Sequence, residues 1–129
     1  MARINCRTKG ANGEREFIKW AQSILDLNEE AKRNLEQTRN GGADIYVDCF
    51  AFEVKRVEAL DFRKWWMQAK RQAGTDYIPV VVYRQNKQPW RILISAENVG
   101  LDYGYIALGA REAVKWLQKT HEAWLFGKF

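Results

Sequence analysis

The chain has 129 residues, a length typical of one domain that buries a core of its own. Hydrophobic residues make up 47% and aromatic residues 13%, which excludes a disordered chain. Its net charge of +5 favours an acidic partner, of which nucleic acid is the commonest for a small basic domain. The two cysteines, Cys6 and Cys49, lack the spacing of a zinc site or a disulfide framework and favour a reducing, cytoplasmic setting. No apolar run approaches the length of a membrane span, so we expect no membrane partner.

The first helix is expected to begin near Gly13 with Asn12 as its N-cap, after a basic arm over residues 1–11. That arm could contact phosphate or could be a frayed terminus. Apolar residues at helical spacing then predict a core-facing stripe, formed by Phe17, Ile18, Ala21, Ile24 and Leu25. Glu14 shares this stripe, so its carboxylate should point toward the fold, although a helix N-terminus also favours an acid there. Glu16 lies off the stripe and fits the second explanation better.

Residues 28–34 are polar and predict a loop with a helical turn. The following stretch, Leu35–Arg39, favours an edge strand that runs into a turn at Asn40–Gly42, although it would also suit a helix end. Two β-rich runs come next, over residues 43–47 and 50–56, and flank an Asp-Cys pair. They predict an antiparallel hairpin.

In that hairpin Val47 would face Phe50, Ile45 would face Phe52, and Asp44 would face Glu53. Side chains alternate between the two faces of a strand, so one face is apolar. The other face carries Asp44, Tyr46, Glu53 and Lys55. Directly opposed like charges are destabilising, and a hard divalent cation would compensate them. A solvated polar face is the alternative.

A second helix is expected between Asp61 as its N-cap and Gly74 as its C-terminal stop. Residues 78–83 form a continuous apolar run that is typical of a strand buried on both faces, and residues 90–94 predict a further strand. Helical spacing returns over residues 109–126. The order helix, three strands, helix, two strands, helix predicts an α/β fold with a mixed sheet.

The candidate site comprises Asp44, Glu53 and Lys55, with Glu14 brought in from the first helix. Converging carboxylates bind Mg²⁺ or Mn²⁺, and such a cation activates water and stabilises charge that builds up on a phosphate. A lysine on the same face could hold or deprotonate that water, so the set suits phosphodiester hydrolysis. The chain has no Gly-rich phosphate loop, so we expect no nucleotide cofactor. The only histidine, His121, is interpreted as structural.

These residues resemble a known signature. Asp44 followed by Glu53-Val54-Lys55 resembles the D…ExK motif of the PD-(D/E)XK nuclease superfamily. The stretch Lys9–Glu16 looks like the KGxxxERE start of archaeal-type Holliday junction resolvases, and Arg39–Gly42 looks like the turn before their first acid. Residues 77–94 are similar to phage-encoded members of the superfamily. The resemblance covers about residues 9–95, with Ala43 in place of the proline of the superfamily name.

The resemblance implies one nuclease domain over residues 1–129, with its core at about 9–95 and a C-terminal helical extension over 97–129. The fold would be a restriction-endonuclease-like mixed sheet of about five strands flanked by helices. Carried over by position, the metal ligands would be Glu14, Asp44, Glu53 and the carbonyl of Val54, and Lys55 would be the catalytic lysine. Contacts with DNA would come from Lys9, Arg15, Arg39 and Gln68, the last matching a glutamine found in exonuclease branches.

The implied function is a metal-dependent, structure-selective DNA endonuclease, with a Holliday junction resolvase as the main expectation. Because a four-way junction is two-fold symmetric and needs paired nicks, the resemblance implies a homodimer. It would act in the cytoplasm, which is the host cytoplasm for a phage-encoded protein. One alternative is another nuclease of the same fold, such as a nicking, end-processing or restriction-like enzyme. The other is a non-catalytic DNA-binding module.

Overall fold

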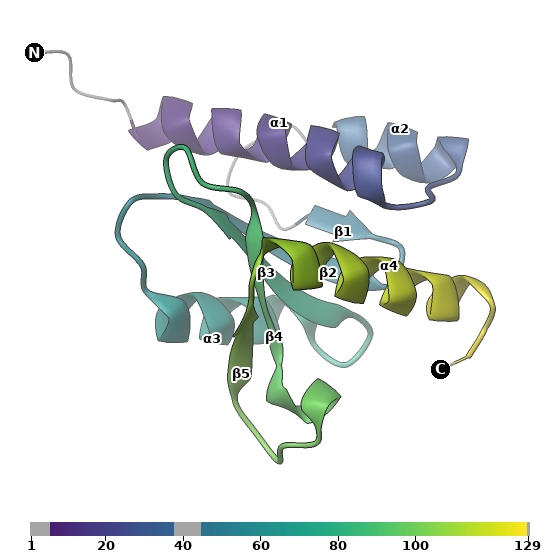
Figure 1. The fold of residues 1–129 in the computed structure, drawn as a ribbon. Coiled ribbons are helices and arrows are strands. Elements are labelled where there is room, and N and C mark those ends of the chain that lie inside the picture. The colour runs from purple at the N-terminus through teal and green to yellow at the C-terminus, as the bar shows by residue number, and fades with distance from the viewer. Residues whose placement is uncertain (1–5, 38–44, 129) are drawn as a thin grey trace, which may run out of the picture.

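A five-stranded mixed β-sheet forms the centre of the computed structural model, and helices cover both of its faces (Figure 1). The structure describes residues 6–37 and 45–128, with side chains from residue 12 onward. The strands lie in the order of the chain: β1 (Ile45–Val47), β2 (Phe50–Arg56), β3 (Ile78–Arg84), β4 (Arg91–Ser95) and β5 (Tyr105–Leu108). Only β2 and β3 pair in parallel, and the other neighbours are antiparallel. The predicted α/β class with a mixed sheet is confirmed.

The helices form two layers around this sheet. They are α1 (Cys6–Ile24), α2 (Glu29–Gln37), α3 (Phe62–Ala73), the short 3₁₀ helix η1 (Ala96–Val99) and α4 (Ala110–Leu125). Side chains of α1, α2 and α4 pack on one face, whereas α3 is the crossover between β2 and β3 and packs on the other. Within the described residues, no helix is long and apolar enough to cross a membrane.

The larger core lies under α1, α2 and α4. Phe17 from α1 packs on Phe52 from β2, with ring centroids 4.9 Å apart, and Leu117 from α4 is fully buried in the same cluster. The smaller core lies under α3, where Trp65 packs against Tyr83 of β3. Alternate residues of β3 and β4 therefore serve different cores, as the two-residue period of a strand requires.

The hairpin between β1 and β2 has the predicted register. Ile45 pairs with Phe52 and Val47 pairs with Phe50, and the turn falls at Asp48 and Cys49. Asp48 adopts a φ of 50°, a left-handed conformation that aspartate tolerates better than most residues.

The structure differs from two predictions near the N-terminus: the start of the first helix, and the loop and edge strand expected before the hairpin. Helix α1 begins at Cys6, so residues 6–11 belong to it and Asn12 lies within the helix rather than at its cap. Residues 29–37 form α2, so the favoured loop and edge strand are wrong and the alternative of a helix end at residues 35–37 is confirmed. The oxygen Oδ1 of Asn28 accepts a hydrogen bond from the backbone N–H of Ala31, which caps this helix, and Leu35 is fully buried beneath it. The buried leucine follows a helical and not a strand period.

The sheet also contains a strand that the sequence did not predict. β5 pairs with β4 in antiparallel register, Ile94 facing Ile106 and Ile92 facing Leu108, and forms one edge of the sheet. In the part of the chain that the structure describes, residues 35–37 do not form the expected edge strand. The sheet still has the predicted number of about five strands, because β5 takes the place of the missing one. Residues 97–129 thus contribute a strand as well as the predicted helix.

Candidate functional site

Glu53 and Lys55 form an ion pair on β2, with 3.1 Å between the lysine Nζ and the carboxylate Oε1. Their cross-strand partners on β3 are Val81 and Tyr83, which belong to the core beneath α3. Both side chains therefore lie on the α3 face, as the two-residue spacing predicts. Their exposed fractions are 14% for Glu53 and 23% for Lys55, so the pair lies in a partly desolvated position where a charge interacts more strongly than in water.

Gln68 on α3 has a buried side-chain oxygen, Oε1, with no hydrogen-bond donor among the described residues. The hydroxyl of Tyr46 on β1 donates to the backbone carbonyl of Gln72, one helical turn after Gln68. Tyr46 pairs with Ala51, which lies two residues before Glu53 on the same face. Since α3 returns antiparallel to β2 and one helical turn spans about the length of two strand residues, we expect Gln68 at about the level of Glu53 along the sheet.

Glu14 lies on α1, in the layer that covers the other face of the sheet. It lies half-buried on α1, next to Gly13, whose Cα faces the side chain of Arg56 at the end of β2. A Cβ built on Gly13 would lie 2.5 Å from the Cβ of Arg56, so α1 and β2 touch closely at this crossing. However, α1 covers the Phe52 face and Lys55 lies on the opposite face. The convergence of Glu14 with the Glu53–Lys55 pair therefore stays a prediction.

A charged cluster beside this crossing was not predicted. One carboxylate oxygen of Glu16 accepts hydrogen bonds from Arg56 Nε and Arg84 Nη1, each at 3.2 Å. Arg56 and Arg84 are register partners at the carboxyl ends of the two parallel strands. Arg56 also donates through Nη2 to Asn86, at 3.0 Å. Because α1 begins at Cys6, Glu16 is too far along the helix for its N-terminal dipole to favour it, and the two arginines account for its position instead.

Of the remaining predicted site residues, some lie outside the part of the chain that the structure describes, and Arg15 and Val54 can be placed. Asp44 and Arg39 lie outside the described residues, as does the side chain of Lys9. Arg15 is exposed on α1, as a phosphate contact requires. Val54 packs its side chain against the core beneath α1, which leaves only its backbone for the predicted metal contact.

The described residues fit a metal site in part. They contain no group of three or more His, Cys, Asp or Glu side chains that could hold an ion. Mg²⁺ usually binds through one or two carboxylates and several waters. The carboxylate of Glu53 and the buried Oε1 of Gln68 on the facing helix are oxygen atoms of the right chemistry, and Asp44 lies outside the described residues.

Two other side chains of chemically reactive types, His121 and Cys49, are buried in the fold rather than placed in the candidate site. His121 is buried, and its Nε2 lies 2.7 Å from Oδ2 of Asp48 at the hairpin turn. Burial raises the pKa of the Cys49 thiol to about 12, so this cysteine stays protonated at neutral pH and is a poor nucleophile. Neither residue shares the α3 face with Glu53.

Comparison of the chain with protein-family models, with characterised proteins and with solved structures found no significant match.

Proposed function

We propose that this protein is a metal-dependent nuclease that hydrolyses phosphodiester bonds in DNA, with a restriction-endonuclease-like fold of the PD-(D/E)XK type. The observation that carries the proposal is the partly buried Glu53–Lys55 pair on β2. A carboxylate and a lysine two residues apart on one strand face are the ExK half of that signature. The basic net charge of +5 is consistent with a polyanionic substrate.

In this proposal Glu53 and Asp44 hold the cation, with Glu14 as a further ligand, and a bound divalent cation would polarise the phosphate and activate water. Lys55 lies within hydrogen-bonding distance of the Glu53 carboxylate, so its Nζ is oriented along the strand face. From there it would hold the attacking water or neutralise charge on the phosphate oxygens. The buried Oε1 of Gln68 would accept a hydrogen bond from a water molecule in the same site.

The proposed substrate is branched DNA, with the four-way junction first, and the proposed active form is a homodimer that makes paired nicks. This part rests on the KGxxxERE-like stretch at residues 9–16, where α1 crosses the end of β2 through Gly13. Another nuclease of the same kind, acting on linear or nicked DNA, is the alternative, and a non-catalytic DNA-binding module is the second alternative.

Glu53→Gln provides the test of catalysis. It keeps the size of the side chain and removes the charge, so it should abolish cleavage of a synthetic four-way junction in Mg²⁺ while binding in Ca²⁺ persists. Glu97→Gln is the matched control, because Glu97 is exposed on η1, away from the site. Wild-type activity in Glu53→Gln would refute the role of Glu53.

A substrate panel distinguishes the alternatives. Junction, linear duplex and single-stranded DNA are compared at equal concentration. Symmetric nicks on the junction alone support the resolvase, whereas cleavage of linear DNA supports another nuclease. Binding without any cleavage, together with no heat of Mn²⁺ binding in calorimetry, would support the binding module.

A further inference from the structure

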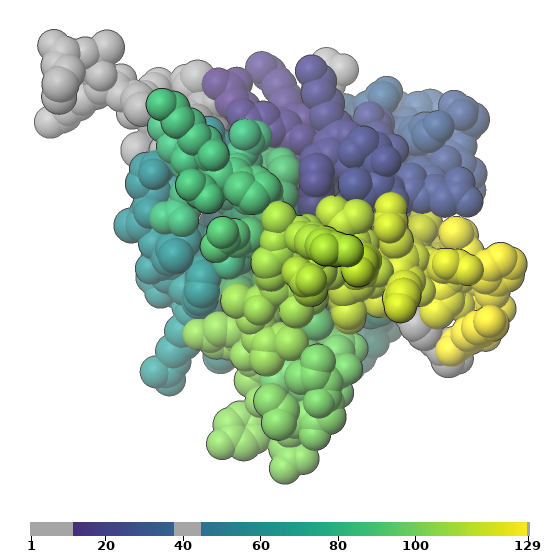
Figure 2. Space-filling model, viewed as in Figure 1, coloured from purple at the N-terminus to yellow at the C-terminus, as the bar shows by residue number. Residues whose placement is uncertain are grey.

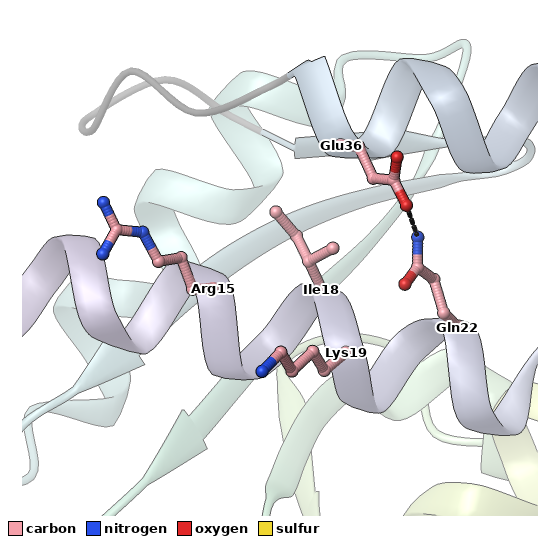
Figure 3. A pocket seen from close by; sticks show the side chains of 5 residues that line it. All are labelled: Arg15, Ile18, Lys19, Gln22 and Glu36. Atoms are coloured by element: carbon pink, nitrogen blue, oxygen red, sulfur yellow. Dashed lines mark hydrogen bonds between the residues drawn. The ribbon is translucent and has the colours of Figure 1, made fainter.

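A groove between α1 and α2 lies on the opposite layer from the Glu53–Lys55 pair. It has a volume of about 520 Å³ and is lined by Arg15, Ile18, Lys19, Gln22 and Glu36 (Figure 3). Four of these residues come from α1 and the fifth comes from α2. The proposed catalytic residues do not include any of them.

The chemical character of the side chains that line the groove changes along its length, from cationic through apolar to polar and acidic. Figure 3 shows Arg15 at one end, Lys19 along α1 below Ile18 with its ammonium directed toward that end, and a hydrogen-bonded amide and carboxylate at the other end. There the Nε2 of Gln22 donates to Oε1 of Glu36, at 3.1 Å. Ile18 lies between the two ends, points toward α2 and gives the groove an apolar wall.

A nucleotide of a single strand has the same sequence of chemical groups. Its phosphate is anionic, the sugar and base faces are largely apolar, and the base edge carries N–H donors and acceptors. Arg15 and Lys19 are four residues apart on one helix, so their side chains lie about one turn apart and could hold neighbouring phosphate oxygens. An acidic peptide would match the cations but would bring its own charge toward Glu36.

We infer that the α1–α2 groove binds one nucleotide of a single-stranded nucleic acid, with its phosphate at Arg15 and Lys19 and its base edge at Gln22 and Glu36. The inference rests on the proposed function for the choice of nucleic acid as the partner. It adds a site for unpaired strand, which a branched or frayed substrate supplies and a blunt duplex lacks. A groove of this volume, between two helices, admits one strand and not a duplex.

Binding without cleavage provides the test, because it does not depend on catalysis. The full chain is titrated into fluorescently labelled single-stranded oligodeoxycytidine in EDTA, and anisotropy gives the dissociation constant at several salt concentrations. Arg15→Ala/Lys19→Ala should weaken binding by on the order of tenfold and lower the slope of log K against log salt by about 0.7, the value for one neutralised phosphate of a single strand.

The matched control is Lys115→Ala/Lys119→Ala. These lysines are also exposed and four residues apart on a helix, but they lie on α4. The control removes the same amount of charge at a place outside the groove. It should therefore leave most of the affinity and the salt slope unchanged. Equal losses in the two double variants, or no loss in Arg15→Ala/Lys19→Ala, would overturn the inference. Thermal unfolding checks that both variants remain folded, as expected for exposed side chains.

The other end of the groove makes a second, independent measurement possible. Glutamate accepts hydrogen bonds from exocyclic amino groups, which cytosine carries and thymine does not. Oligodeoxycytidine should therefore bind several-fold more tightly than oligodeoxythymidine, and Glu36→Ala should remove the difference. A preference that survives this substitution would refute the placement of the base. Polyglutamate that competes as well as the oligonucleotide would instead identify the groove as a peptide site.

The outcomes separate the two proposals. Loss of groove binding in Arg15→Ala/Lys19→Ala together with a wild-type protein that cleaves no DNA would refute only the nuclease. Cleavage that depends on Glu53 together with unchanged binding in Arg15→Ala/Lys19→Ala would refute only the groove.

Discussion

Gly13 sets the distance between α1 and β2. A Cβ at this position would lie 2.5 Å from Cβ and 3.1 Å from Cγ of Arg56. The Cβ of an arginine is fixed to the backbone, so it cannot move aside as the far end of the side chain could. Glycine in a helix interior normally costs about 1 kcal/mol relative to alanine. Here only a glycine permits the close approach of α1 to β2, which explains why a residue of low helix propensity occupies this position.

Gly13→Ala should therefore destabilise the protein although it improves helix propensity. We expect the free energy of unfolding to fall by about 1–3 kcal/mol, the usual range for overpacking, as measured by urea denaturation. Asn12→Ala is the control, because Asn12 is the preceding residue of the same helix and is exposed. It should leave stability unchanged or slightly raise it. A Gly13→Ala protein more stable than wild type would show that the crossing can relax.

At the same scale, local patterns predicted some contacts and not others. The strand period was enough to place Glu53 and Lys55 on one face, because only two residues separate them. The contact of Glu16 with Arg84 joins residues 68 positions apart and depends on where α1 crosses the sheet. Arg84 directly follows the apolar run of residues 78–83, whereas Arg56 follows Lys55, so the two arginines share no local signal for their common position at the strand ends.

At the scale of elements, a polar contact between Asp48 and His121 ties the β1–β2 hairpin to α4. Oδ2 of Asp48 lies 2.7 Å from Nε2 of His121, and the imidazole ring stacks with the rings of Phe50 and Trp124. His121 is buried, so loss of its partner would leave a polar ring atom unsatisfied, which typically costs about 1–3 kcal/mol. The hairpin that carries the candidate catalytic strand thus depends on the C-terminal helix for its position.

Three substitutions of Asp48 separate the hydrogen bond from the backbone conformation. Asp48→Asn retains an acceptor and tolerates a φ of 50°, so it should stay close to wild-type stability. Asp48→Gly removes the acceptor but suits that φ, whereas Asp48→Ala removes the acceptor and is strained. Urea denaturation should rank the proteins Asn, Gly, Ala in decreasing stability. A Gly variant as stable as wild type would show that the contact with His121 contributes nothing.

Two elements, β5 and α2, were not predicted from the sequence, and each has its own physical reason. The strand β5 is an edge strand of four residues, too short for a clear alternation of apolar and polar side chains. In α2 the start signals were present, because Asn28 precedes Glu29 and Glu30 and caps the helix. Leu35 was assigned to a strand because the residues that follow it lead toward the hairpin. Tertiary packing of Leu35 decides for the helix.

At the scale of the whole molecule, α4 and β5 complete the fold. Ala113 and Leu117 of α4 are fully buried in the larger core, and Ile106 and Leu108 of β5 pack against the same cluster. Figure 2 shows α4 lying across the molecule, over this face of the sheet. The resemblance placed the nuclease core at about residues 9–95. The hydrophobic core of the fold extends beyond that range, and the bounds of a nuclease core stay a prediction.

A chain truncated after Gly109 should therefore fail to fold cooperatively. Loss of α4 would expose Phe50, Ile92 and Ile94 of the sheet and leave Asp48 without His121, and removal of one large buried side chain alone costs about 2–5 kcal/mol. We expect no sharp urea transition and strong binding of a hydrophobic dye. The control is a chain truncated after Leu125, which keeps the whole of α4 and should unfold like wild type. A cooperative transition of wild-type midpoint in the shorter chain would show that residues up to Gly109 form an independent core.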